Sequence, residues 1–142
     1  MYSRILVPLE NSPADETILT HARELAKRLG STLVLIHVAD GWAARNVNEL
    51  ELRESQEIRE DRAYLEAVSG RLEAEGFDAE AVLAGGEPAK EIAAAAEREH
   101  CDLIAMATHG HRLLGDVVKG STATALRHLT RIPVLMVRVD KK

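Results

Sequence analysis

Five short apolar runs, separated by longer stretches of mixed polarity, constrain the fold of this chain more than any other feature. The runs cover residues 5–9, 32–38, 79–84, 102–107 and 132–139. Runs of this length without polar–apolar alternation are typical of strands that are buried on both faces. Parallel strands need long crossover connections, which helices normally supply. The pattern therefore predicts an α/β fold: an open five-stranded parallel sheet with helices on both faces.

The stretches between the runs carry helix signals. In the first stretch, apolar residues recur at helical spacing up to Gly30, a typical helix stop, with Ser12 as the expected cap and Pro13 as the first helical residue. The last helix is expected over 121–130. The piece 42–54 has weak periodicity, which favours a mobile loop or a short helix.

Length and charge restrict the classes of function. A chain of 142 residues with 46% apolar residues fits one domain, residues 1–142, with a single core. Its net charge of −5 argues against a nucleic-acid partner, which needs a basic face. No apolar run approaches the roughly 20 residues of a membrane span, and residues 1–4 do not resemble a secretory leader. These features favour a cytoplasmic protein with no membrane partner.

Two loops are the expected place for a ligand. In open parallel sheets, ligands bind beyond the carboxyl ends of the strands, where the strand order reverses. Residues 9–12 follow the first run, and residues 108–112 follow the fourth. Gly110 and Gly120 permit close backbone approach, and Ser121 at an expected helix start would favour an anion. An ordinary capped turn explains the same residues, so both interpretations stay open here.

Other candidate groups favour plainer roles. His109 and His111 are interpreted as surface residues of a polar loop, so no metal site is expected. Cys101 precedes a buried strand and is interpreted as a structural residue. His37 is expected to be a core or near-site residue. No nucleophile, base and orienting group form a recognisable set, so no catalytic residue is assigned.

Several segments resemble the universal stress protein family. They are ILVPLENS, LIHV, GEPAKEI, DLIAMATHG and GSTATALRHLTRIPVLMVRV, and together they span nearly the whole chain. Gly110, nine further residues, Gly120 and Ser121 keep the spacing of the signature in ATP-binding members. Ala107 stands where that signature begins with glycine, and Glu10 where the family usually has aspartate. The resemblance implies a Rossmann-like, adenine nucleotide alpha hydrolase-like sheet with strand order 3-2-1-4-5.

The resemblance also implies a site for ATP, or for ADP or AMP, alone or with Mg²⁺ or Mn²⁺ carried by the phosphates. The adenosine side would be lined by Pro8, Leu9 and Glu10, with Val38 against adenine. The ribose and first phosphates would be bordered by Met106, Ala107, His109 and Gly110. The outer phosphates would be held by Gly120, Ser121, Thr122 and Ala123.

The last run suggests a partner. Residues from Ile132 to Val139 are apolar on both faces and are expected at the sheet edge, where an uncovered strand promotes aggregation. Pairing with the same strand of a second copy would cover it, and the resemblance implies this homodimer. The alternative is a monomer whose edge is covered by the tail 141–142.

The sequence thus predicts a dimeric adenine-nucleotide-binding module in the stress response, with an unknown protein partner and no dedicated catalytic machinery. Ala107 and Glu10 favour an alternative, a nucleotide-free member of the family that acts as a dimeric interaction or stress-survival protein. A slow ATPase is the second alternative, because hydrolysis near a phosphate-bound metal needs no residue that the sequence identifies.

Overall fold

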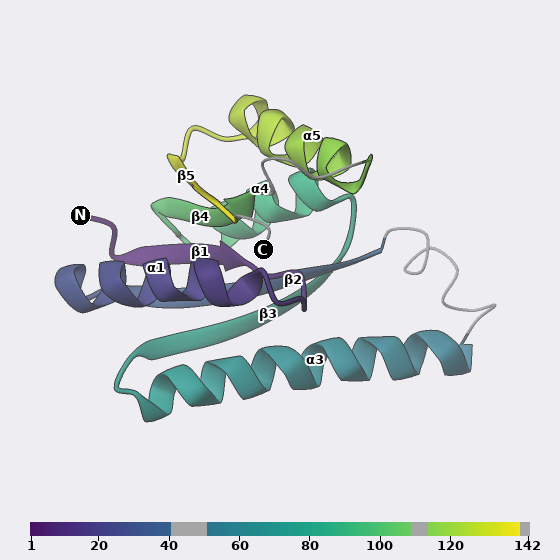
Figure 1. Cartoon of the computed structure of the whole chain (residues 1–142), viewed down its shortest axis with the longest axis horizontal. Helices are drawn as coiled ribbons and strands as arrows, with labels where there is room; N and C mark the ends of the chain where they lie inside the picture. Colours follow the sequence, from purple (N-terminus) through teal and green to yellow (C-terminus); the bar gives the residue numbers. More distant parts are fainter. Residues whose placement is uncertain (41–50, 109–113, 140–142) are drawn as a thin grey trace.

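The computed structural model describes residues 1–40, 51–108 and 114–139, with the backbone alone for 40, 51–55 and 114–121. Strands and helices alternate along the chain (Figure 1). The order is β1 (Arg4–Pro8), α1 (Asp15–Leu29), β2 (Thr32–Asp40), α3 (Glu51–Ala74), β3 (Asp78–Gly86), α4 (Pro88–Arg98), β4 (Leu103–Thr108), α5 (Leu114–Leu129) and β5 (Val134–Arg138). Of the weakly periodic piece 42–54, residues 51–54 belong to α3, and the rest lies outside the described residues.

The strands form one parallel sheet in the order β3-β2-β1-β4-β5. This confirms the fold and the strand order expected from the sequence. Ile5 in the central strand pairs with Leu33 on one side and Leu103 on the other. The strand order reverses between β1 and β4, so the switch point lies at the carboxyl ends of these two strands.

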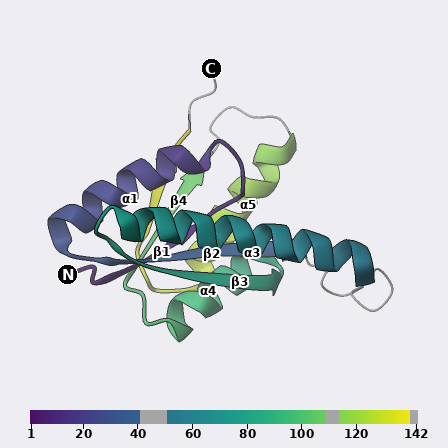
Figure 2. The same cartoon turned by 90° about the horizontal axis from the view of Figure 1, so that it is seen from below.

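Helices cover both faces of the sheet (Figure 2). On one face, Ile5 and Val7 pack with buried residues of α1 and α3, among them Ile18 and Leu65. On the other face, Leu6 packs with α4 and α5 residues, including Ile92 and Leu126. Successive residues of β1 thus point to opposite faces, and both are buried, which explains the unbroken apolar run of its sequence.

The start of α1 differs from the expectation. The helix begins at Asp15, and the cap position is held by Ala14 without a side-chain hydrogen bond. Ser12 still acts locally, because its Oγ accepts the Ala14 N–H at 3.3 Å. The capping signal at Ser12 and Pro13 therefore predicts a start that is too early: residues 12–14 form turns that lead into the helix, and Asp15 bonds the loop amides before it.

The start of α5 is a larger correction. The helix begins at Leu114, so Gly120 and Ser121 lie inside it and not at its first turn. A glycine inside a helix costs about 1 kcal/mol relative to alanine, which tertiary packing can offset. The Gly–Ser pair looked like a helix start because both residues favour helix ends. The phosphate site cannot therefore rest on free amides of a helix N-terminus at Ser121.

The start of α4 is capped by the residue that precedes it. Pro88 is its first residue, and the Glu87 carboxylate accepts the N–H groups of Ala89 and Lys90, each at 3.2 Å. This cap ties the carboxyl end of β3 to the helix and sets Pro88 at the same edge of the sheet as the switch point.

The last strand lies at the sheet edge, as its apolar sequence predicts. Leu135 and Met136 of β5 are 37% and 50% exposed. Among the described residues, no helix is both long and apolar enough to cross a membrane.

Candidate functional site

A cavity of about 330 Å³ opens at the carboxyl ends of β1, β2 and β4. Its lining is mostly apolar, with buried floor residues that include Leu9, Ile36, Ile92 and Met106. Ligand pockets usually hold about 300–1,000 Å³ and combine an apolar lining with a few polar groups. The cavity also lies at the topological switch point, where ligands of such sheets bind.

The cavity brings together many of the residues singled out in the sequence. Its lining includes Pro8, Leu9, Glu10, Val38, Met106, Ala107 and Thr122. These residues come from four different elements or their ends, far apart along the chain. Ala123 is not in the lining: it is buried in the core between the sheet, α4 and α5. Gly120 and Ser121 belong to α5, while His109 and Gly110 lie outside the described residues.

Sequence reasoning missed part of the lining. Ile36, Pro88 and Ile92 were not assigned to the site, and His37 was assigned only a core or near-site role. Pro88 and Ile92 stand in the first turns of α4, which begins beside the carboxyl end of β3. The rule that ligands bind at strand ends could have pointed to Pro88, because β2 and β3 are neighbours in the sheet.

Polar contacts fix the rim of the cavity. His37 Nδ1 lies 3.0 Å from the Leu9 carbonyl, which can only accept, so this nitrogen carries a proton. His37 Nε2 lies 3.3 Å from Asp61 Oδ2 of α3. Glu10 Oε1 accepts the Ser12 hydroxyl at 3.4 Å. The described residues contain no group of three or more His, Cys, Asp or Glu side chains that could hold a metal ion.

The loop after β1 closes around a buried carboxylate. Asp15 is 1% exposed, and its oxygens accept the backbone N–H groups of Glu10, Asn11 and Ser12 at 2.9, 2.8 and 3.3 Å. The Tyr64 hydroxyl of α3 donates to the same carboxylate at 2.5 Å. Burial, helped by this hydrogen bond, raises the pKa of Tyr64 well above its ordinary value, so the hydroxyl remains a donor.

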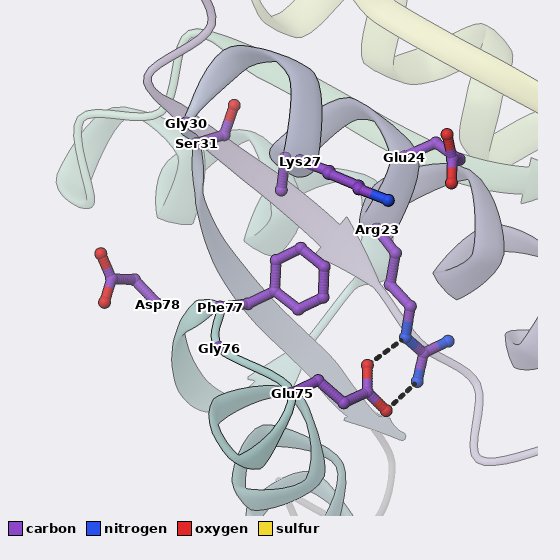
Figure 3. A pocket seen from close by; sticks show the side chains of 10 residues that line it. Arg23, Glu24, Lys27, Gly30, Ser31, Glu75, Gly76, Phe77 and Asp78 are labelled. Carbon is purple, nitrogen blue, oxygen red and sulfur yellow. Dashed lines mark hydrogen bonds and ion pairs between the residues drawn. The ribbon is translucent and has the colours of Figure 1, made fainter.

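A second, larger hollow of about 590 Å³ lies at the opposite edge, between the end of α1 and the turn from α3 to β3 (Figure 3). Its rim is charged. Arg23 and Glu75 form a two-bond ion pair with distances of 2.7 and 3.3 Å, beside the half-buried Phe77. The hollow contains none of the residues that the sequence assigned to a ligand, and it faces away from the switch point. The carboxyl-edge cavity is therefore the candidate site.

Comparison with known proteins agrees with this geometry. The model of the universal stress protein family matches residues 1–138. The universal stress protein MJ0577 of Methanocaldococcus jannaschii is 28% identical over 97% of this chain and 96% of its own length. Its solved structure superposes with a TM-score of 0.83 and 25% identity, covering 100% of this chain and 99% of that chain.

Two further solved structures share the fold and are complexes with nucleotides. One is a universal stress protein in complex with cAMP, with a TM-score of 0.70 and 18% identity, covering 96% of this chain and 97% of the other. The other is a universal stress protein of Archaeoglobus fulgidus in complex with dAMP, with a TM-score of 0.67 and 21% identity, covering 96% and 98%. These ligands were found with those two proteins.

Proposed function

We propose that this chain, which belongs to the universal stress protein family, binds an adenine nucleotide in the cavity at the carboxyl edge of its sheet. One observation carries the proposal: Pro8, Leu9, Glu10, Val38, Met106, Ala107 and Thr122, which the sequence assigned to a nucleotide, line a single cavity. Two family members described in complex with cAMP and dAMP support the same ligand class.

The lining suggests how the nucleotide would lie. Adenosine would occupy the apolar part of the cavity, with Val38 against the base and Met106 bordering the ribose and first phosphates. The Glu10 carboxylate at the rim would accept hydrogen bonds from ribose hydroxyls. Phosphates would extend along β4 toward α5, past Ala107 and Thr122. We keep the remaining assignments that the resemblance implies: residues 109–110 would border the ribose and first phosphates, and Gly120, Ser121 and Ala123 would hold the outer phosphates.

ATP is the proposed nucleotide, with ADP and AMP as close alternatives. A Mg²⁺ or Mn²⁺ ion would be held by the phosphate oxygens, because such ions prefer oxygen ligands and bind largely through substrate phosphates. We assign no general base, so binding and not hydrolysis is the proposed activity. Phosphate release at the same rate in the Gly120→Val variant and the unaltered protein would remove the slow-ATPase alternative.

The direct test is nucleotide release. The purified protein is denatured, and released adenine nucleotide is measured by absorbance and chromatography, alongside thermal shifts with Mg-ATP, ADP and AMP. We expect bound nucleotide or a saturable rise in the melting temperature. An empty protein that shows no shift with any of the three would contradict the proposal and favour the nucleotide-free alternative, to which Ala107 and Glu10 point.

A homodimer through β5 is the second part of the proposal. Leu135 and Met136 expose apolar surface on an edge strand, and pairing with a second β5 would cover it and complete the hydrogen bonds of that edge. Light scattering after size exclusion is expected to give twice the chain mass, and Met136→Lys to give a monomer. A monomeric unaltered protein would contradict this part.

A further inference from the structure

Asp15 is a buried charge that the proposed binding contacts do not use. It stands at the first position of α1 and is 1% exposed. Burying an ionised carboxylate is strongly unfavourable unless hydrogen bonds or opposite charges compensate. The compensation here consists of three backbone amides and one phenol, all aimed at one side chain.

The three amides belong to consecutive residues: Glu10, Asn11 and Ser12. Asn11 has φ +63°, the left-handed conformation that lets neighbouring N–H groups point inward together. Successive amides arranged in this way form a nest, a concave site that binds anions. In this chain the anion in the nest is the protein's own carboxylate.

Tyr64 holds this carboxylate from the other side. Its hydroxyl donates to Asp15 Oδ2, the same oxygen that accepts the Asn11 amide. Tyr64 belongs to α3, so the bond ties that helix to the loop after β1. A second tie runs nearby, because Asp61 of α3 contacts His37, whose other nitrogen bonds the Leu9 carbonyl.

The loop held in this way is one wall of the candidate site. Leu9 and Glu10 line the cavity, and the Leu9 amide bonds the Ile36 carbonyl of β2 at 2.7 Å. β2 therefore fixes the chain up to Leu9, and Asp15 fixes it from Glu10 to Ser12.

We propose that Asp15, anchored by Tyr64, is a positioning residue of the nucleotide site: as an internal anion it fills the nest after β1 and directs the phosphates of a bound nucleotide to the β4 side. The amides of this loop are already bonded, and the carboxylate repels a second anion placed there. The loop therefore suits the uncharged nucleoside part of the nucleotide and not its phosphates. This inference rests on the proposed function for its nucleotide part, whereas the filled nest can be tested without nucleotide.

The first experiment replaces the internal anion. Asp15→Ala empties the nest, and we expect a lower melting temperature that sodium formate, a small carboxylate, restores in a saturable way. Sodium chloride at equal ionic strength should not restore it. The unaltered protein and Ser31→Ala should not respond to formate. Ser31 is the matched control: it is also buried, and its hydroxyl bonds the Tyr2 carbonyl at the opposite edge. The absence of a formate effect on Asp15→Ala, or an equal effect on all three proteins, would overturn the filled nest.

The second experiment measures ATP affinity by calorimetry and does not depend on Asp15→Ala folding. Tyr64→Phe removes one hydroxyl and keeps the ring. We expect roughly threefold to tenfold weaker ATP binding, because a hydrogen bond that fixes the loop is lost. Ser31→Ala removes a hydroxyl elsewhere and should bind ATP as the unaltered protein does.

The outcomes separate the two proposals. If the unaltered protein binds no nucleotide, the proposed function fails while the formate response still decides whether the nest is filled. If the unaltered protein binds ATP and Tyr64→Phe binds it equally well, the positioning role is wrong although the function stands.

Discussion

The two edges of the sheet use their polar groups in opposite ways. At the amino edge, charged groups pair with one another: Arg4 bonds Glu80 across strands, and Asp102 accepts the amides of Ser3 and Arg4. At the carboxyl edge, the cavity is mostly apolar, and the buried charge of Asp15 organises the wall behind it. The larger hollow lies at the amino edge, yet the smaller cavity has the features of a binding site. Chemistry and position therefore identify the site better than volume does.

The largest expected effect tests whether the Cys101 thiol at the amino edge is protected from alkylation. Burial raises the pKa of the Cys101 thiol to about 11. At pH 8, only about one thiol in a thousand would then be the reactive thiolate. We expect alkylation by iodoacetamide to be more than about a hundredfold slower in the native protein than in urea, measured by mass spectrometry. Equal rates would show that this edge opens readily.

A matched pair of bulky substitutions tests the comparison directly. Val38→Trp fills the carboxyl-edge cavity, and we expect at least about tenfold weaker ATP binding because the adenine space is lost. Lys27→Trp adds the same ring at the amino-edge hollow and should leave the affinity unchanged. Calorimetry on both variants is the measurement. A loss of binding in Lys27→Trp alone would move the site to the other edge.

The loss of stability in acid tests the structural role of the Asp102 charge at the amino edge. Burial alone would raise the pKa of Asp102, but the amides of Ser3 and Arg4 outweigh it and hold the pKa below its ordinary value. A lowered native pKa means that Asp102 stabilises the fold fully above about pH 4, the unfolded value, and that this stabilisation is lost as pH falls through the native pKa.

We expect Asp102→Asn to lower the free energy of unfolding by about 1 kcal/mol at pH 7 and to flatten the acid dependence, measured by urea unfolding from pH 7 to pH 3. The Asp102→Asn curve should approach that of the unaltered protein at the acid end. A constant difference across this range would argue against the charged form as the cause.

The smallest expected effect concerns Ala107, the departure from the family's glycine signature. Ala107 lines the cavity and lies in β4 opposite Val137, in ordinary strand pairing. Ala107→Gly removes one methyl group and is expected to leave ATP affinity unchanged or to tighten it by about twofold, because space near the phosphates increases. A large loss of affinity would show that the methyl group contributes to binding.

Most of the fold could be predicted from the sequence, because each strand is a short apolar run and each connection has a helical period. The strand order came from the resemblance, because periodicity alone does not say which strands are neighbours. The start of α5 was wrong because Gly120 and Ser121 favour helix ends locally, whereas packing sets where the helix begins. Asp15 has no distinguishing pattern in the sequence, because its bonds to the loop amides depend on the fold of residues 10–12 and its bond to Tyr64 joins residues 49 positions apart.

The position of β1 at the centre of the sheet has a consequence for folding during synthesis. β1 is made first, but its pairing with β4 joins Ile5 to Leu103. One half of the fold can associate as it leaves the ribosome; it consists of β1, β2, β3, α1 and α3. One side of β1, however, stays unpaired until about a hundred further residues have been translated. Contacts this distant along the chain form slowly, and an uncovered central strand is prone to aggregation. The interval before β4 emerges is therefore when the uncovered side of β1 in a nascent chain is most prone to aggregate.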